Sequence, residues 1–177
     1  MAHDDGLIYW YDPDPRAILP LDRLHVSRSL KRVMKKRPFQ IKINHAFTEV
    51  MRACAKSAPD REETWISEGI VTVYTQLHQM GFAHSIEAWQ DDKLVGGLYG
   101  IAVGGLFAGE SMFSLVTDSS KVALVHLIRH LQDRNFTLLD IQFMTPHLRR
   151  FGAIEVSSTE YKRRLQKALA VPAQFIK

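Results

Sequence analysis

Apolar and polar residues follow two different periods along this chain, and the period changes near Gly81. Before that point, apolar residues recur at helical spacing from Phe47 to Cys54 and from Ile70 to Leu77, which predicts two amphipathic helices. Polar and apolar residues alternate from Phe39 to Asn44, so a strand is expected ahead of the first helix. The polar segment from Lys56 to Thr64 joins the two helices as a loop.

Beyond Gly81 the pattern predicts three consecutive strands. Ala83 to Gln90 and Lys93 to Ala102 are expected to pair across a turn at Asp91-Asp92, and a third strand runs to about Phe113. Strands joined by such short connections form an antiparallel meander. The uncharged run from Leu94 to Gly109 belongs to these strands and not to a membrane span. Its sixteen residues are fewer than the ~20 that a bilayer requires, and six of them are glycine.

The rest of the chain alternates helices with short strands. The expected elements are a helix capped by Ser119 or Ser120, a strand at Leu138 to Phe143, a helical turn at His147 to Phe151, a strand at Ala153 to Val156 and a helix at Thr159 to Ala170. This order predicts a mixed α/β (α+β layered) fold with a largely antiparallel sheet flanked by helices. The same order is found in the GNAT-like (acyl-CoA N-acyltransferase-like) fold.

Two prolines near the N-terminus mark the clearest boundary in the chain. In Asp12-Pro13-Asp14-Pro15, each proline restricts its own backbone and that of its predecessor. A short strand is expected before this segment, from Leu7 to Tyr11, and an extended segment from Ala17 to Leu21 begins the main body. We therefore expect a division between residues 1–16 and residues 17–177.

Length and composition indicate an ordinary globular protein. With 177 residues, 46% of them hydrophobic and 24% charged, the chain is long enough for one domain with its own core. The composition excludes collagens, long disordered chains and disulfide scaffolds. Cys54 is the single cysteine, so nothing requires an oxidising compartment. Met1 to Gly6 carry no signal-peptide pattern, and we expect a cytoplasmic protein with no membrane association.

The positive charge is concentrated in one predicted helix. The chain has 23 basic and 19 acidic residues, but the segment from Arg28 to Arg37 holds six cations and no acid. Its cations are Arg28, Lys31, Arg32, Lys35, Lys36 and Arg37. Ser27 is expected to cap this helix, and Leu30 is expected to face inward. The exposed cations could bind the phosphates of a nucleic acid; a solvated surface helix is the alternative.

Two absences narrow the possible chemistry. The connection from Ser114 to Ser120, where an acetyl-CoA enzyme needs a glycine-rich turn for the pyrophosphate, has no glycine and carries Asp118. If the fold is GNAT-like, its acyl donor is therefore expected to be something else. His126 and His130 are four residues apart but belong to no zinc-protease motif, and we interpret them as surface histidines. No metal is expected.

Two acidic residues inside apolar strands are the strongest candidates for chemistry. Glu110 precedes Met112, and Asp140 lies within the apolar segment Leu138 to Phe143. Burying an isolated carboxylate is costly, so such a residue is either paired or functional. In a strand, Asp140 and Gln142 point to the same face and could act on one ligand. A structural hydrogen-bonded pair is the alternative.

A series of longer motifs runs in order along nearly the whole chain. They are Pro20 to Leu30, Thr64 to Ile66, His84 to Trp89, Leu94 to Gly100, Gly109 to Ser114, Ser120-Lys121, Leu139 to Phe143 and Phe151 to Ala153. Together these motifs resemble those of bacterial leucyl/phenylalanyl-tRNA–protein transferases. Ordinary acetyltransferases do not share them.

The resemblance implies an aminoacyltransferase with a GNAT-like catalytic domain and no cofactor. Such an enzyme moves Leu or Phe, less often Met, from aminoacyl-tRNA to the N-terminal Arg or Lys of an acceptor protein. The product then enters the N-end rule degradation pathway. Residues 1–16 would be a remnant of the family's N-terminal lobe, residues 17–177 would be the catalytic domain, and a monomer is expected.

The resemblance also implies roles for individual residues. Asp140 and Gln142 would be the catalytic pair, Glu110 a polar residue of the active site, and Trp65 a contact for the terminal adenosine. The pocket for the Leu or Phe side chain would be lined by Leu98, Phe107, Met112, Leu124 and Leu139. Plain core packing is the alternative for Leu98, Leu124 and Leu139. The basic helix from Arg28 to Arg37 would hold the acceptor-stem phosphates.

The chemistry of the ester favours positioning over proton abstraction by Asp140. An ordinary carboxylate, with a pKa of about 3.9, is a poor base toward an α-amine with a pKa of about 7.7–8.0. We therefore expect Asp140 to polarise Gln142, which orients the amine, and the proton to leave through the ribose hydroxyl or water.

The sequence also departs from the family pattern. Leu115 stands where the family commonly has arginine, and Ser157-Ser158 stands where Pro-Arg is usual. Both differences could weaken tRNA contacts. Two alternatives therefore stay open beside the transferase: a GNAT-type acetyltransferase, and a non-catalytic tRNA-binding remnant that lacks the N-terminal lobe.

Overall fold

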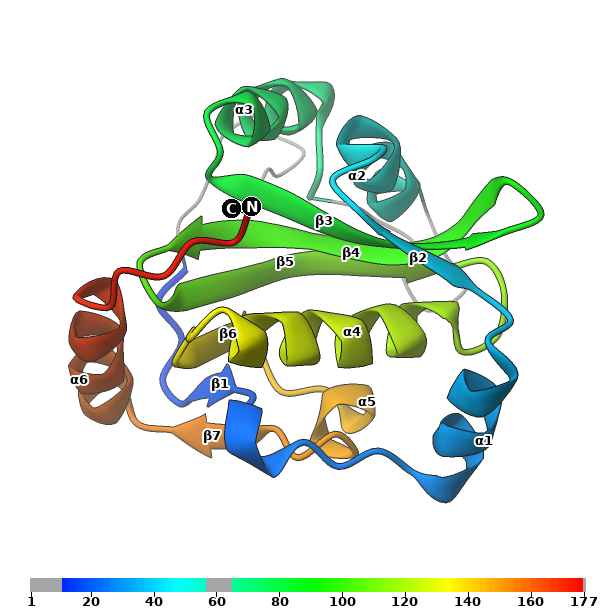
Figure 1. Ribbon diagram of the computed structural model, residues 1–177. Helices are drawn as coiled ribbons and strands as arrows, with labels where there is room; N and C mark the ends of the chain where they lie inside the picture. The colour runs from blue at the N-terminus through cyan, green and yellow to red at the C-terminus, as the bar shows by residue number, and fades with distance from the viewer. Residues whose placement is uncertain (1–10, 57–64, 177) are drawn as a thin grey trace.

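One seven-stranded sheet organises the protein, with strand order β2-β3-β4-β5-β6-β1-β7. The computed structural model describes residues 11–56 and 65–176 (Figure 1). Its strands are β1 (Arg16–Ile18), β2 (Gln40–Ile43), β3 (Ala83–Gln90), β4 (Lys93–Val103), β5 (Leu106–Ser114), β6 (Leu138–Gln142) and β7 (Ile154–Val156). All neighbouring strands are antiparallel except β5 and β6, which run parallel. The mixed α/β fold expected from the sequence is confirmed.

Helices cover both faces of this sheet. They are α1 (Arg28–Lys36), α2 (Phe47–Ala55), α3 (Glu68–Gln79), α4 (Ser119–Asp133), α5 (Pro146–Arg149) and α6 (Ser158–Leu169), with a 3-10 turn at Leu21–Arg23. Figure 1 shows α2 and α3 on one side of the meander and α4 on the other. The apolar stripes predicted for these helices form the core, because α2 and α3 pack around Tyr99 while α4 packs around Leu98 and Leu139. Among the described helices, none has the length and apolar character to cross a bilayer.

Most of the predicted elements lie within a few residues of the observed ones. The meander β3-β4-β5 is confirmed, and the uncharged run from Leu94 to Gly109 forms parts of β4 and β5. The cap of α1 is also confirmed, since the Ser27 hydroxyl accepts a hydrogen bond from the Leu30 amide at 3.2 Å. The strand expected at Leu7 to Tyr11 and the loop expected at Lys56 to Thr64 lie largely outside the described residues.

The prediction that Ser119 or Ser120 caps α4 is wrong. Asp118 occupies the N-cap position with φ 69°, and its side chain makes no capping bond. Ser119 is the first residue of the helix, and its hydroxyl donates to the Val95 carbonyl of β4 at 2.9 Å. This contact brings the start of α4 so close to Gly96 that a side chain there would collide with Ser119. The Ser119 hydroxyl, which was expected to cap the helix, therefore bonds to β4 instead.

The sheet opens where β5 and β6 stop pairing. The parallel ladder has three pairs, which begin at Leu106 with Leu138 and end at Ala108 with Asp140. Beyond Ala108, β5 continues along β4 while β6 pairs with β1. The two parallel strands therefore part after a short contact, and their ends form the two walls of a cavity.

Candidate active site

A cavity of about 460 Å³ lies where β5 and β6 part. Its apolar wall is formed by Leu98, Met112, Leu124, Leu127, Leu139 and Ile141, and aromatic rings are supplied by Tyr11, Trp65, Tyr74, Tyr99 and Phe143. Polar groups from β5, β6 and the segments around them complete the lining: Arg16, Glu110, Ser111, Gln142, Thr145 and His147. The site thus combines an apolar compartment with a small number of polar groups, which is typical of a binding site for a small organic group.

The structure places four of the five residues expected in the aminoacyl pocket in this wall. Leu98, Met112, Leu124 and Leu139 line the cavity. Phe107 does not: it is completely buried, and its ring stacks on Phe175 with the ring centres 5.3 Å apart. Phe107 belongs to the part of β5 that still pairs with β6, below the point where the strands separate. Phe107 is a residue of the hydrophobic core and not of the cavity lining.

Glu110 reaches the cavity through an irregularity in β5. Gly100 of β4 pairs with Gly109 and Tyr99 pairs with Ser111, so Glu110 between them has no partner of its own in this ladder. A bulge of this kind changes the direction of a side chain. Burial raises the pKa of Glu110 to about 7, against the hydrogen bond from Tyr74, and the Asp140 carboxylate adds to the rise. Glu110 is therefore a carboxyl group that changes charge near neutral pH.

Asp140 has a different environment although it lies on the neighbouring strand. Its side chain is 1% exposed and does not line the cavity. The carboxylate accepts hydrogen bonds from Arg16 Nη2 at 2.7 Å and from the Tyr161 hydroxyl at 2.8 Å. The backbone N–H of Gln142 donates a third bond, at 3.0 Å. Asp140 is thus both neutralised by a guanidinium and fully occupied by donors.

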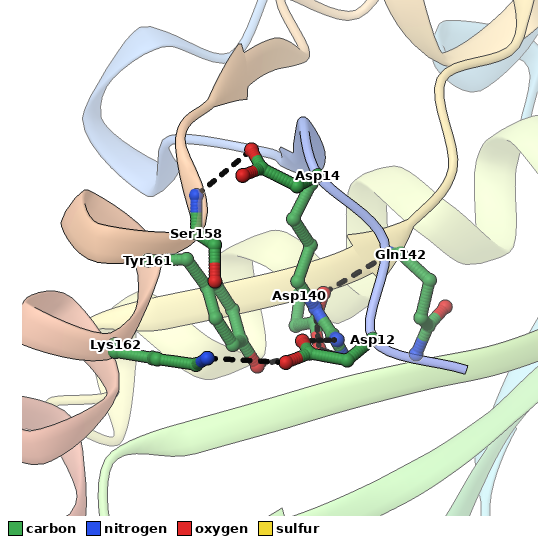
Figure 2. A network of polar contacts seen from close by, with 8 residues as sticks. Asp12, Asp14, Asp140, Gln142, Ser158, Tyr161 and Lys162 are labelled. Atoms are coloured by element: carbon green, nitrogen blue, oxygen red, sulfur yellow. Dashed lines mark hydrogen bonds and ion pairs between the residues drawn. The ribbon is translucent and has the colours of Figure 1, made fainter. Parts of the chain in front are cut away.

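The expectation that Asp140 and Gln142 share one face of a strand is wrong. Gln142 has φ 54°, in the left-handed region, so the alternation of side chains along β6 ends there. As a result, Gln142 lines the cavity while Asp140 packs on the α6 side with Tyr161. The link between the two residues runs through the Gln142 backbone and not through its amide side chain. Figure 2 shows this contact between Gln142 and Asp140 as a dashed line.

Three polar residues that bond the carboxylates of this region were not predicted from the sequence. Arg16 was assigned to the N-terminal remnant, but it lines the cavity and binds Asp140. Tyr74 lies on α3 and hydrogen-bonds Glu110, and Tyr161 lies on α6. Arg16 is 124 residues and Tyr161 is 21 residues from Asp140 in the sequence, and Tyr74 lies on a different element from Glu110. No local spacing pattern could therefore have identified these partners.

The predictions for Trp65 and for the histidines of α4 have different outcomes. Trp65 lines the cavity, as expected for a contact to a ligand there. His126 and His130 are not free surface groups: both are half-buried, and the His130 ring bonds the Phe175 carbonyl at 2.8 Å. His147, which was not predicted, lines the cavity, and its Nε2 atom is buried without a hydrogen-bond partner in the described structure. Burial lowers the pKa of His147, which keeps the ring neutral.

The six cations of the basic segment are all exposed on or next to α1. In residues 11–56 and 65–176, none of them forms an ion pair with a carboxylate. A groove of about 600 Å³ runs between this helix and α4. Its charged and titratable residues are Lys31, Lys35, Arg37, His126 and Arg129, and no acid lines it. The helix α4 therefore contributes Arg129 to this groove and Leu124 to the cavity.

Comparisons with known proteins identify the family. A leucyl/phenylalanyl-tRNA–protein transferase of Herpetosiphon aurantiacus is 56% identical over 97% of this chain and 88% of its own length. One of Phenylobacterium zucineum is 53% identical over 98% of this chain and 79% of its own length. The family described as leucyl/phenylalanyl-tRNA protein transferase matches residues 18–166. The chain belongs to this family.

The resemblance noted in the sequence is thereby confirmed, and the protein is a transferase. The match to the leucyl/phenylalanyl-tRNA–protein transferase family includes every cavity residue except Tyr11 and Arg16. Among solved structures, L-PGS from Bacillus licheniformis is similar with a TM-score of 0.50 at 12% identity, over 72% of this chain and 44% of that chain. A likeness at this identity concerns the fold alone.

Proposed function

We propose that this protein transfers Leu or Phe, less often Met, from aminoacyl-tRNA to the N-terminal Arg or Lys of an acceptor protein. The observation that carries the proposal is the cavity, in which an apolar compartment ends at Glu110 and Gln142. Family membership supports the same reaction. We further propose a monomeric cytoplasmic enzyme that marks its acceptors for N-end rule degradation. A GNAT-like class is supported by the antiparallel strands β2 to β5 followed by the parallel pair β5-β6.

The apolar wall suits the side chain of the donor amino acid. Leu98, Met112 and Leu124 come from three different elements and surround the same space. An apolar pocket discriminates one methylene group by only about 1–3 kcal/mol, so it accepts Leu, Phe and Met but rejects polar side chains. Met112 has a flexible thioether that adapts to either a branched or a flat occupant.

Glu110 is the proton acceptor that fits the reaction. An α-amine has a pKa of about 7.7–8.0, and general bases work best when their pKa is near the operating pH. The pKa of Glu110, raised to about 7 by burial, meets this condition. Asp140 does not serve as the base in this mechanism, because Arg16, Tyr161 and the Gln142 amide occupy its oxygens. When ionised, Glu110 also attracts an acceptor with a cationic first residue.

The bond changes follow from these positions. The neutral amine nitrogen attacks the ester carbonyl carbon, and the bond from that carbon to the ribose oxygen breaks. The proton that the attacking nitrogen gives up passes through Glu110 to the departing ribose oxygen. Gln142, whose amide lines the cavity, orients the amine, and Trp65 stacks on the terminal adenine.

The basic groove suits the acceptor stem of the tRNA. Lys31, Lys35 and Arg37 on one side face Arg129 on the other, with no carboxylate between them. Contacts of this kind bind phosphates and position the nucleic acid without reading its sequence. Because burial and Arg129 lower the pKa of His126, the groove's charge at neutral pH comes from the lysines and arginines.

A transfer assay tests the proposal directly. Labelled Leu-tRNA is incubated with the protein and a peptide that begins with Lys or Arg, and a peptide that begins with Gly is the control. We expect label only on the Lys and Arg peptides. A second reaction replaces Leu-tRNA by acetyl-CoA and is expected to give no product. Acetylation without leucylation would show that the protein is an acetyltransferase, and no transfer from either donor would refute the proposed reaction.

A further inference from the structure

The carboxylate of Asp140 joins two segments that are far apart in the sequence. Arg16 lies at the start of β1 and Tyr161 lies on α6, and both donate to Asp140 on β6. Figure 2 shows Asp140 and Tyr161 together with the polar contacts that surround them. Neither bond is needed to pair the strands, because β1 and β6 are already held by their own ladder. The contacts among these three side chains are therefore expected to serve a purpose other than forming the sheet.

The contact from Arg16 is a two-point contact. Its Nη2 atom is 2.7 Å from Oδ2 of Asp140, and its Nε atom is 3.1 Å from Oδ1. Such bidentate pairs fix the orientation of a carboxylate as well as its charge. Burial alone would lower the pKa of Arg16, but the Asp140 carboxylate outweighs burial and raises it. Arg16 therefore stays charged and holds Asp140 in one orientation.

Tyr161, on α6, donates to the same carboxylate oxygen as the Arg16 Nη2 atom. Its hydroxyl donates to Oδ2 of Asp140 at 2.8 Å, and the Arg16 guanidinium lies 4.3 Å from the centre of its ring. Burial, together with the Asp140 carboxylate, raises the pKa of Tyr161, so the phenol stays protonated and remains a donor. Tyr161 does not line the cavity, and any effect that it has on a bound ligand must pass through Asp140.

The backbone at Gln142 needs such support. A left-handed conformation is unfavourable for a residue other than glycine and persists only where neighbouring groups hold it. Here the Phe143 amide also bonds back to the Ile141 carbonyl at 2.6 Å, which makes Gln142 the centre of a tight three-residue turn. Oδ1 of Asp140 accepts the Gln142 N–H at 3.0 Å and so holds the turn in place. This turn is what directs the Gln142 side chain into the cavity.

We propose that Arg16 and Tyr161 are positioning residues of the active site. Together they hold the Asp140 carboxylate in one orientation. The carboxylate stabilises the backbone turn at Gln142, and this turn keeps the Gln142 side-chain amide at the cavity wall. The role in catalysis rests on the proposed function, whereas the positioning of Gln142 does not. By this assignment Asp140 positions Gln142 through the Gln142 backbone N–H and not through its side-chain amide.

The segment before β1 is tied to α6 by the same network. Asp12 pairs with Arg16 at 3.4 Å and with Lys162 at 3.2 Å, and the Asp14 carboxylate accepts the Ser158 amide at 3.1 Å (Figure 2). These bonds keep Arg16 and Tyr161 at a fixed separation. The N-terminal segment thus contributes to the site by holding Arg16 in place.

The experiment uses Tyr161→Phe, which removes one hydroxyl and keeps the ring that packs with Ile18 and Leu138. The first readout is amide hydrogen exchange at Gln142, followed by NMR. We expect its protection to fall about tenfold while the amides of β4 keep theirs. The second readout is transfer to a Lys-initiated peptide, in which we expect kcat to fall about fivefold and KM for aminoacyl-tRNA to stay within twofold.

Two further variants give the matched comparison. Arg16→Lys keeps the charge but loses the two-point contact, so it should reduce the protection of the Gln142 amide less than Arg16→Gln does. Glu160→Gln on α6 removes exposed ion pairs with Arg163 and Arg164 next to Tyr161, and it should change neither readout.

The outcomes separate this inference from the proposed function. Unchanged exchange at Gln142 in Tyr161→Phe overturns the positioning role. Faster exchange with unchanged kcat shows that the turn is held but that the reaction does not use it, which overturns the catalytic part. If the unsubstituted protein transfers no amino acid while exchange responds as expected, the proposed function fails and the positioning of Gln142 stands.

Discussion

Two carboxyl groups lie on adjacent strands beside the same cavity, yet their surroundings give them opposite properties. Glu110 is half-buried beside Tyr74 and forms no ion pair with a cation in the described structure, and desolvation raises its pKa to about 7. Asp140 is bonded to Arg16, and two further donors occupy its oxygens. Burial alone therefore does not assign a role to an acidic residue in a strand. The partner decides whether the group takes up a proton or organises its neighbours.

The largest effect is expected from Asp140→Asn. This substitution leaves the Arg16 guanidinium without its buried counter-ion, and breaking such a pair costs about 3 kcal/mol of unfolding free energy. Denaturant titration measures the loss. Asp133→Asn, an exposed acid on α4, is the control and should change stability by less than about 0.5 kcal/mol. Transfer activity, measured under folding conditions, should fall by no more than about tenfold, because Asp140 is not the base. A loss above about a thousandfold with stability intact would reverse the two roles.

Glu110→Gln should have the larger effect on the reaction. The amide keeps the shape of the side chain but cannot accept a proton, and the loss of a general base lowers kcat by about 100-fold or more. Stability should not fall, because the variant no longer buries an ionisable group. Glu49→Gln, on an exposed part of α2, is the matched control. If kcat drops less than about fivefold, Glu110 only attracts the acceptor.

The pH dependence sharpens the comparison further. Since Glu110 acts as a base when ionised, kcat should rise with pH through about pH 7, where its raised pKa lies, and level off above it. Its pKa is higher in the folded chain than in the unfolded chain, so the folded state binds more protons between about pH 4.5 and 7. The contribution of Glu110 to the unfolding free energy therefore falls as pH rises through this window. Both trends should disappear in Glu110→Gln, measured by rate profiles and by denaturation at several pH values.

The smallest effect is expected outside the cavity, at Arg129. Replacing this exposed groove cation by glutamine should weaken tRNA binding a few-fold and reduce the slope of log affinity against log salt by about one. Arg52→Gln serves as the control, because Arg52 is an exposed cation on α2 and does not line the groove. Filter binding over a range of salt concentrations gives both slopes. Equal slopes for the two variants would remove the α4 side of the groove from the tRNA site.

The sequence was sufficient for the order of elements and for most of the apolar wall. Periodicity located α2, α3 and the meander because their apolar residues face one shared core. It failed at Gln142, since a rule based on regular strands cannot anticipate a left-handed residue. The family resemblance implied a place for Phe107 in the pocket, but Phe107 lies where β5 still pairs with β6, and the sequence does not reveal where these strands separate.

The polar partners of the site were beyond the reach of local patterns. Arg16 and Asp140 are 124 residues apart, and only the pairing of β1 with β6 brings them together. Tyr74 and Tyr161 stand in ordinary amphipathic helices, where a tyrosine is usually a packing residue. Their roles depend on the packing of α3 beside Glu110 and of α6 beside Asp140, which the sequence pattern does not reveal.

The helix α4 separates the apolar cavity from the basic groove, and its thickness has a consequence for the nucleic acid. A helix with its side chains is about 10–12 Å across. With about 3.4 Å for each stacked nucleotide, crossing it takes roughly three unpaired nucleotides. If the groove holds the acceptor stem, as proposed, the unpaired 3′ end must be long enough to span this width. An aminoacylated stem-loop whose unpaired 3′ end is two nucleotides shorter should bind the groove, but its ester should not reach the cavity.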